Sequence, residues 1–86
     1  MISDNVIHNL IVVEIKNSRE KYGNFQSTHE GYAVIKEEMD ELWDCVKSND
    51  LKSAQVESCQ VAAMAIKFIQ DLDSMRERSS KKVNIR

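Results

Sequence analysis

The chain contains no proline in its 86 residues and only two glycines, Gly23 and Gly31. Proline breaks helices and glycine weakens them, so long stretches of this chain are free to be helical. Hydrophobic residues make up 42% of the chain and charged residues 30%, a balance typical of globular rather than disordered proteins. We therefore expect an all-α fold formed by a single small domain.

The first helix is expected over residues 3–21. Ser3 or Asp4 can cap its start, and Gly23 just past its end is a stop signal. An apolar stripe at helical spacing indicates that this helix is amphipathic. The stripe consists of Val6, Leu10 and Val13.

Two further helices are expected over residues 27–47 and 51–73. Ser27 and Glu30 form a capping box at the start of the second helix, and Asp50 can cap the third. Helix connections this short usually join antiparallel neighbours. The sequence therefore predicts a helical hairpin with one additional helix packed on it.

The second helix carries two neighbouring stripes, each with a spacing of three and four residues. The first is apolar and typical of a seam that packs on a partner helix. It consists of Tyr32, Ile35, Met39, Leu42 and Val46. The second places two carboxylates between residues that prefer burial, so we expect it also to face inward. It consists of Val34, Glu38, Glu41 and Cys45.

The third helix is apolar nearly all round between Val61 and Ile69, where the only charge is Lys67. This pattern predicts a central helix that is buried on several sides. Just before it, Glu57 and Gln60 are three residues apart and share a face.

A turn centred near Asn49 would place Glu41 level with Glu57 and Glu38 level with Gln60. The sequence thus predicts one polar cluster across the hairpin. Closely spaced carboxylates must take up protons, attract basic side chains or hold a cation. No lysine or arginine lies on the stripe that contains Glu38 and Glu41 or on the face that contains Glu57 and Gln60. We therefore favour a hard divalent cation such as magnesium.

These residues resemble a known family, the MazG-like all-α nucleoside triphosphate pyrophosphohydrolases. Glu37, Glu38 and Glu41 match the family's E-E-x-x-E motif. Glu57 opens the second motif, E-x-x-D, but Gln60 stands where the family usually has aspartate. The segments HEGYAVIKEEMDELWDCVK and QVAAMAIKFIQDL are similar to short, single-domain members found in phages and bacteria. The resemblance covers roughly residues 20–72.

The resemblance implies hydrolysis of a nucleoside triphosphate to the monophosphate and pyrophosphate, with Mg²⁺ or Mn²⁺ as cofactor. Glu38, Glu41 and Glu57 would be metal ligands, Gln60 would occupy the fourth ligand position, and Glu38 or Glu41 would act as catalytic base. Family members form dimers or dimers of dimers. Because an amide lacks the charge of a carboxylate, Gln60 also leaves a second hypothesis open. The chain could be a weak or inactive MazG-like oligomer that binds a nucleotide or a protein partner.

Several other residues have two interpretations each. Lys36 and Lys67 could contact phosphate or extend to solvent, and Trp43 could stack on a base or pack in a core or dimer interface. Tyr22 and Phe25 could wall a base pocket or cover the end of the hairpin.

The domain is expected to span residues 1–75, followed by a basic, flexible tail over residues 76–86. The small size favours a homodimer or homotetramer of the four-helix-bundle type. A net charge of −2 makes nucleic acid an improbable partner, and the apolar runs are too short to cross a membrane. Cys45 and Cys59 form no disulfide framework, which is typical of a cytoplasmic protein.

Overall fold

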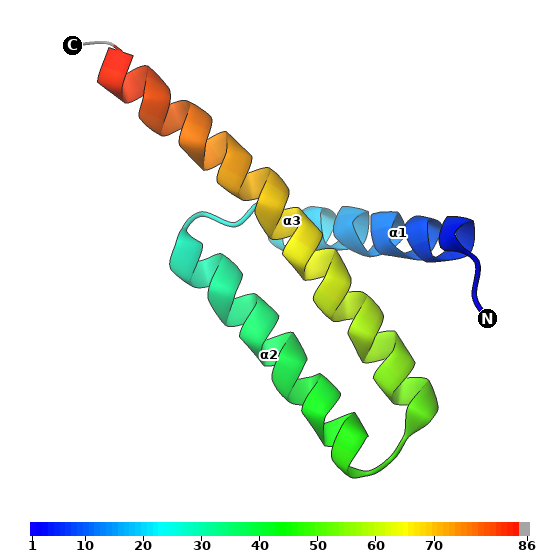
Figure 1. Ribbon diagram of the computed structural model, residues 1–86. Helices are drawn as coiled ribbons and strands as arrows, with labels where there is room; N and C mark the ends of the chain where they lie inside the picture. Colours follow the sequence, from blue (N-terminus) through cyan, green and yellow to red (C-terminus); the bar gives the residue numbers. More distant parts are fainter. Residues whose placement is uncertain (85–86) are drawn as a thin grey trace.

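A computed structural model describes the backbone of residues 1–84 and the side chains through Ser79. Helix α1 spans Asp4–Tyr22, α2 spans Thr28–Lys47 and α3 spans Leu51–Asn84, and these described residues contain no strand. Helices α2 and α3 form an antiparallel hairpin, and α1 crosses α3 (Figure 1). The predicted all-α fold, a hairpin with one packing helix, is confirmed.

The helix boundaries follow from local hydrogen bonds. The Ser3 hydroxyl accepts from the amide of Val6 at 3.3 Å and starts α1. The Ser27 hydroxyl accepts from the amide of Glu30 at 3.1 Å and starts α2. Asp50 Oδ1 accepts from the amide of Ser53 at 3.1 Å and starts α3. All three predicted caps are therefore formed.

Both connections depend on residues with positive φ. Gly23, with φ of 76°, ends α1, and its amide donates to the carbonyl of Arg19 at 2.9 Å. Asn49, with φ of 55°, forms the hairpin turn, and asparagine tolerates this left-handed conformation better than most residues. The turn therefore lies where the sequence centred it.

Helix α3 is the centre of the fold because it packs against both α1 and α2. Among the described residues, the buried hydrophobic side chains are Phe25 from the α1–α2 connection and Ala63 and Met64 from α3. Gly31 of α2 lets the ring of Phe68 approach closely, since a Cβ at this position would collide with that ring. A core of this size is small for the amount of apolar surface that the chain carries.

Helix α3 is longer than the sequence predicted, since it continues through Asn84 rather than ending near Asp73. No proline or glycine follows Asp73 to stop it. The expected tail therefore begins as helix. Residues 85–86 of that tail lie outside the described residues.

Only some residues of the apolar seam predicted on α2 face the interior of the chain. Ile35 and Leu42 are half-buried within the chain. Tyr32, Met39 and Val46 are exposed to 64%, 47% and 52% respectively, so they are not buried within the single chain, and their packing on a partner helix stays a prediction. The prediction that α3 is buried on several sides is also too broad, because Ile69 is 65% exposed.

None of the helices in the described part of the chain is long and apolar enough to cross a membrane.

Candidate functional site

Three carboxylates meet where α2 and α3 run side by side. Glu38 and Glu41 are three residues apart on α2 and project on one side of it, and Glu57 reaches them from α3. One oxygen of each carboxylate lies within 4.8 Å of an oxygen of the other two. We call Glu38, Glu41 and Glu57 the acidic cluster. The sequence predicted that the hairpin would bring these three residues together, and the structure does so.

The charge of the acidic cluster is not balanced by any ion pair among the described residues. Burial, and then the neighbouring charges of Glu41 and Glu57, raise the pKa of Glu38 to about 7. Burial, followed by the hydrogen bond and charge of Glu41, raises the pKa of Glu57. Glu38 and Glu57 therefore bind protons more tightly than isolated carboxylates do.

One atom of the cluster lacks a partner. Oε2 of Glu57 is buried and makes no hydrogen bond. A buried oxygen without a donor is costly, so such an atom in a folded protein calls for an explanation. A bound cation would provide one, since it would supply the missing partner and balance the charge. The residues present thus fit a divalent cation.

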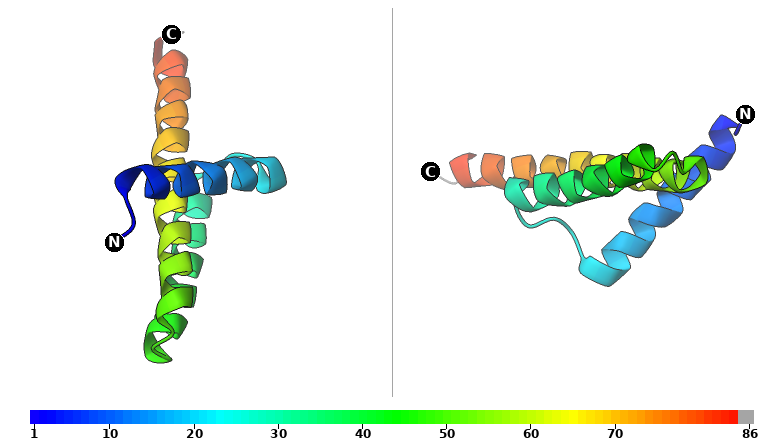
Figure 2. Two further views of the ribbon diagram at one scale, coloured as in Figure 1. Left: turned by 90° about the vertical axis from the view of Figure 1, so that its right-hand side faces the viewer. Right: turned by 90° about the horizontal axis from the view of Figure 1, so that it is seen from below.

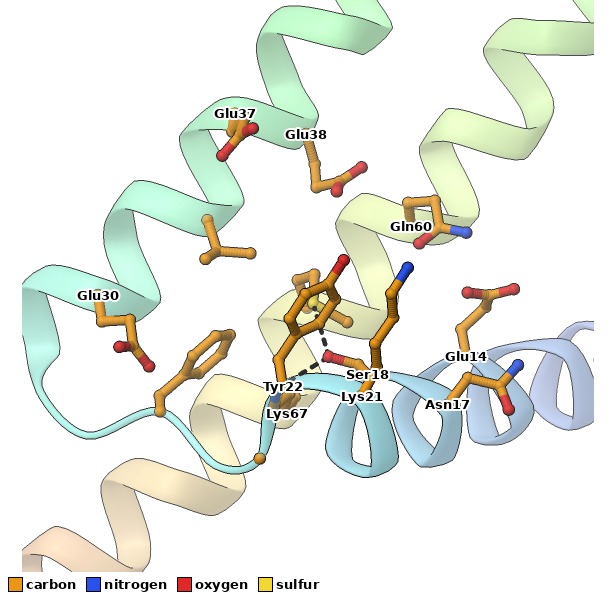
Figure 3. Close-up of a pocket in the computed structure, with 14 residues that line it drawn as sticks. Glu14, Asn17, Ser18, Lys21, Tyr22, Glu30, Glu37, Glu38, Gln60 and Lys67 are labelled. Carbon is orange, nitrogen blue, oxygen red and sulfur yellow. Dashed lines mark hydrogen bonds between the residues drawn. The ribbon is translucent and has the colours of Figure 1, made fainter.

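A cavity of about 690 Å³ opens beside the acidic cluster, between α1 and the hairpin. Glu38 lines it from α2, Gln60 from α3, and Glu14 and Lys21 from α1. Figure 3 shows these four side chains turned toward the same space. The cavity also has an apolar part, lined by Phe25, Val34 and Met64. Its volume is within the range of about 300–1,000 Å³ that is usual for small-molecule sites.

Gln60 lines the same cavity as Glu38. Figure 3 shows its amide turned toward the space that Glu38 also faces. Whether Gln60 shares a ligand with the cluster stays a prediction.

The two candidate substrate-binding residues on α2, Lys36 and Trp43, lie outside the cavity. Lys36 Nζ donates to Asp40 at 3.2 Å on the exposed side of the helix. Trp43 is 58% exposed, and Lys47 Nζ lies 5.8 Å from the centre of its ring. Neither Lys36 nor Trp43 lines the cavity. The structure therefore places both on the surface of the isolated chain.

The cavity wall on the side of α1 contains residues that the sequence did not indicate, notably Asn17 and Ser18. Ser18 accepts a hydrogen bond from Lys67 Nζ at 2.8 Å. Lys67 is only 1% exposed, and its Nζ lies 4.2 Å from the centre of the Phe25 ring. Lys67 therefore does not extend to solvent, so that interpretation is wrong, whereas it lines the cavity and its contact with phosphate stays a prediction. Burial lowers its pKa.

Beside Lys67, Arg19 and Asp71 connect α1 to α3. Arg19 Nη1 lies 2.8 Å from Asp71 Oδ1, and Asp71 Oδ2 accepts from the amide of Phe25 at 2.7 Å. We call Arg19, Lys67 and Asp71 the basic junction. Helical spacing alone could not reveal it, because it joins residues about 50 positions apart that meet only when α1 crosses α3.

Cys45 and Cys59 are free thiols, each half-buried, as expected of small core residues.

No protein family, curated protein or solved structure matches the chain.

Proposed function

We propose that this protein is a metal-dependent hydrolase that converts a nucleoside triphosphate to the monophosphate and pyrophosphate. The observation that carries the proposal is the acidic cluster, which contains a buried oxygen without a partner and borders a cavity large enough for a nucleotide. The E-E-x-x-E motif of the sequence supports the same assignment, since Glu38 and Glu41 are both members of the cluster.

Glu38, Glu41 and Glu57 would hold the metal, with Gln60 available as a neutral oxygen ligand nearby. Carboxylate and amide oxygens are the ligands that Mg²⁺ and Mn²⁺ prefer. When bound, the ion would neutralise phosphate oxygens and acidify water, which is the chemistry that hydrolysis of a phosphoanhydride needs.

The cavity supplies two environments for such a substrate. Phe25, Val34 and Met64 offer an apolar wall for the nucleoside, whereas Glu38 and Gln60 border the part in which the phosphates would lie. Lys21, which makes no ion pair with a carboxylate among the described residues, faces the same space (Figure 3). A cation in this position suits the negative charge of a triphosphate.

Glu38 is one candidate for the catalytic base, because it belongs to the acidic cluster and also lines the cavity in which an attacking water would lie. A carboxylate oxygen that the metal does not use could accept the proton of that water. Glu41 is the second candidate, since it belongs to the same cluster.

We further propose that the protein acts as a homodimer or homotetramer. The single chain buries few hydrophobic side chains and leaves many large ones exposed on all three helices. A partner subunit would bury part of this surface.

The test is release of pyrophosphate from a panel of canonical and modified nucleoside triphosphates with Mg²⁺ or Mn²⁺. We expect metal-dependent turnover by the wild type, and its loss in Glu38→Gln and Glu41→Gln. Asp44→Asn is the matched control, because Asp44 lies on the same helix but pairs with Lys47 on the exposed side. This variant should retain full activity.

Two results would contradict the proposal. Persistent turnover in Glu38→Gln would exclude the acidic cluster as the catalytic site. Absence of turnover with every substrate, in a protein shown to be folded, would favour the second hypothesis, a binding protein that retains the fold. Nucleotide binding measured by calorimetry would then test that hypothesis.

A further inference from the structure

One stripe of α3 forms a wall of the cavity. Gln60, Met64 and Lys67 recur at a spacing of four and three residues, so they share one face of the helix, and all three line the cavity. Figure 2 shows α1 crossing α3 near the middle of α3, and Ser18 of α1 lines the cavity from that side. A ligand in the cavity would therefore contact this stripe of α3 along its length.

The stripe changes in character from one end to the other. Gln60 and Glu38 border the part of the cavity in which the phosphates of a nucleotide would lie. Lys67 follows Gln60 by seven residues, which is two turns, or about 10 Å along the helix. Its Nζ lies 4.2 Å from the centre of the Phe25 ring, and both Phe25 and Met64 belong to the apolar part of the cavity. Lys67 is therefore at the end of the cavity that suits the nucleoside.

The side chain of Lys67 has one hydrogen-bond donor more than the chain uses. Its ammonium group carries three N–H groups. Ser18 Oγ accepts from one of them at 2.8 Å, and the face of the Phe25 ring can attract a second. Among the residues whose side chains the structure describes, no carboxylate forms an ion pair with Lys67. One N–H group is therefore left to donate to a ligand.

Two opposing effects act on the charge of Lys67. Burial lowers its pKa, since the side chain is only 1% exposed, and the negative charge of Asp71, one turn further along α3, opposes this shift. Asp71 therefore favours the charged form of Lys67. In that form the side chain donates hydrogen bonds and accepts none.

The other polar groups at this end of the cavity are already engaged or in contact with water. The Ser18 hydroxyl accepts from Lys67 and donates to the sulfur of Met64 at 3.7 Å, and the dashed lines in Figure 3 mark both hydrogen bonds. Glu30 also lines the cavity, but it is exposed, and its Oε1 accepts from the amide of Gln26 at 3.2 Å. The buried N–H group of Lys67 is therefore the donor that a ligand at this end has to satisfy.

Nucleobases differ in the group that they would present to such a donor. Guanine and thymine carry a carbonyl oxygen at one edge, O6 and O4 respectively, and hypoxanthine and uracil carry the same groups. Adenine and cytosine carry an amino group at these positions, which is itself a donor. A carbonyl oxygen would accept from Lys67, whereas an amino group would leave a buried donor without a partner. Sites of this kind reject the ligand that lacks the required partner.

We propose that Lys67 recognises the base of the bound nucleotide and selects bases that carry a carbonyl oxygen at this edge. These bases are uracil, thymine, guanine and hypoxanthine, and the disfavoured ones are cytosine and adenine. The assignment rests on the proposed function, because it takes a nucleotide as the ligand of the cavity. It gives Lys67 a contact with the base in place of the contact with phosphate that the sequence left open.

The test is calorimetric binding of nucleoside monophosphates to the full-length protein with Mg²⁺. Monophosphates are products of the proposed reaction, so their binding is measured without turnover. UMP and CMP form one pair of ligands, and IMP and AMP form the other. Within each pair, the ligands differ in the carbonyl or amino group and in the proton on the neighbouring ring nitrogen. UMP should bind about tenfold to a hundredfold tighter than CMP, and IMP should exceed AMP by a similar factor.

Lys67→Met keeps most of the length of the side chain but removes the donor. It should lower the affinity for UMP and IMP to the level of CMP and AMP, without weakening the binding of CMP and AMP. Lys36→Met is the matched control, because Lys36 is an exposed lysine outside the cavity. It should bind all four ligands as the wild type does.

A modified ligand serves if Lys67→Met does not fold. The 4-thio analogue of UMP carries sulfur in place of O4, and sulfur is a weaker hydrogen-bond acceptor than oxygen. Its affinity for the wild type should lie between those of UMP and CMP. Affinity equal to that of UMP would show that O4 accepts no hydrogen bond from the protein, and would overturn the proposal.

The proposal is wrong if either pair of ligands binds with equal affinity, or if the amino-bearing member of a pair binds tighter. It is also wrong if the preference persists in folded Lys67→Met, which would assign recognition of the base to another group. An equal loss of affinity for all four ligands in that variant would assign Lys67 to the phosphate instead.

Binding and turnover separate this inference from the proposed function. A preference for UMP and IMP in a protein that releases no pyrophosphate from UTP or ITP would support recognition of the base and refute the hydrolysis. Equal rates of hydrolysis for UTP and CTP, with equal binding of UMP and CMP, would support the hydrolysis and refute recognition of the base by Lys67.

Discussion

The acidic cluster and the basic junction both place charged groups of α3 in contact with another helix, but they differ in how far that charge is compensated by partners within the chain. In the basic junction, both oxygens of Asp71 have partners, Arg19 at 2.8 Å and the Phe25 amide at 2.7 Å. In the acidic cluster, Oε2 of Glu57 has none, and the pKa of Glu38 is raised to about 7. The first group of charges is satisfied within the chain, whereas the second is not.

This difference supports the proposal that the basic junction holds the fold and that the acidic cluster binds a ligand. A buried charge with well-placed partners holds helices in position, and its removal leaves those partners uncompensated. A group of like charges without partners weakens the fold, and such groups persist where a ligand supplies the compensation. The contrast predicts opposite responses to mutation in the two regions.

The largest effect is expected from Asp71→Ala. Removal of this carboxylate leaves the buried Phe25 amide without its acceptor and takes from Arg19 its charged partner, and should lower the free energy of unfolding by about 3 kcal/mol. Urea unfolding at a fixed protein concentration measures it. Asp40→Ala is the control, because the exposed Lys36–Asp40 pair should contribute less than about 1 kcal/mol. Equal losses in the two variants would remove the distinction between the buried and the exposed pair.

Magnesium should act on the acidic cluster alone. At a concentration of about one hundred times its dissociation constant, the ion should add about 2.7 kcal/mol to the stability of the wild type, which thermal unfolding would detect. Glu57→Gln should lose most of this stabilisation, whereas Asp71→Ala should retain it. A shift of the same size in Glu57→Gln would place the ion somewhere other than the acidic cluster.

In the absence of metal, Glu38 should make stability depend on pH. Because its pKa rises on folding from 4.5 to about 7, the folded state binds the proton more tightly, and stability should fall as pH increases through this range and level off above it. Glu38→Gln should reduce the slope, with the remainder due to Glu57, whose pKa is also raised, and after allowance for partial solvent screening it should stabilise the protein at pH 8 by about 1–2 kcal/mol. Urea unfolding from pH 5 to 8 measures the effect, and an unchanged slope in Glu38→Gln would contradict it.

The smallest effect is expected from Gln60→Asp. A carboxylate at this position adds a charged ligand next to the cluster, and should tighten magnesium binding by about fivefold, or close to 1 kcal/mol. Calorimetric titration with Mg²⁺ at fixed pH measures the affinity. Equal or weaker binding in Gln60→Asp would show that this residue lies outside the coordination sphere.

Much of the fold was accessible from local signals. The caps at Ser3, Ser27 and Asp50 and the stop at Gly23 involve partners no more than four residues away, so the sequence contains everything needed to locate them. The predicted end of α3 is wrong because no local signal marks the true end of this helix. With no stop signal after Asp73, the sequence offered no local boundary, and the helix continues to Asn84.

The candidate site could also be predicted only where it depends on local signals. Helical spacing and the position of the turn at Asn49 are sufficient to bring Glu41 and Glu57 together, so the acidic cluster could be predicted. The cavity wall could not, because it depends on where α1 crosses the hairpin, and that crossing is determined by contacts distant in sequence. Lys67 shows this most clearly, since its partner Ser18 lies 49 positions away.

The sequence by itself determined three helices, their order and the register of the hairpin, because helix signals and short connections act over a few residues. The tertiary structure alone decided which apolar residues of α2 are buried. Ile35 and Leu42 face the interior, while Tyr32, Met39 and Val46 remain exposed. Periodicity identifies an apolar stripe but not the surface that covers it, since burial depends on which neighbour the stripe meets.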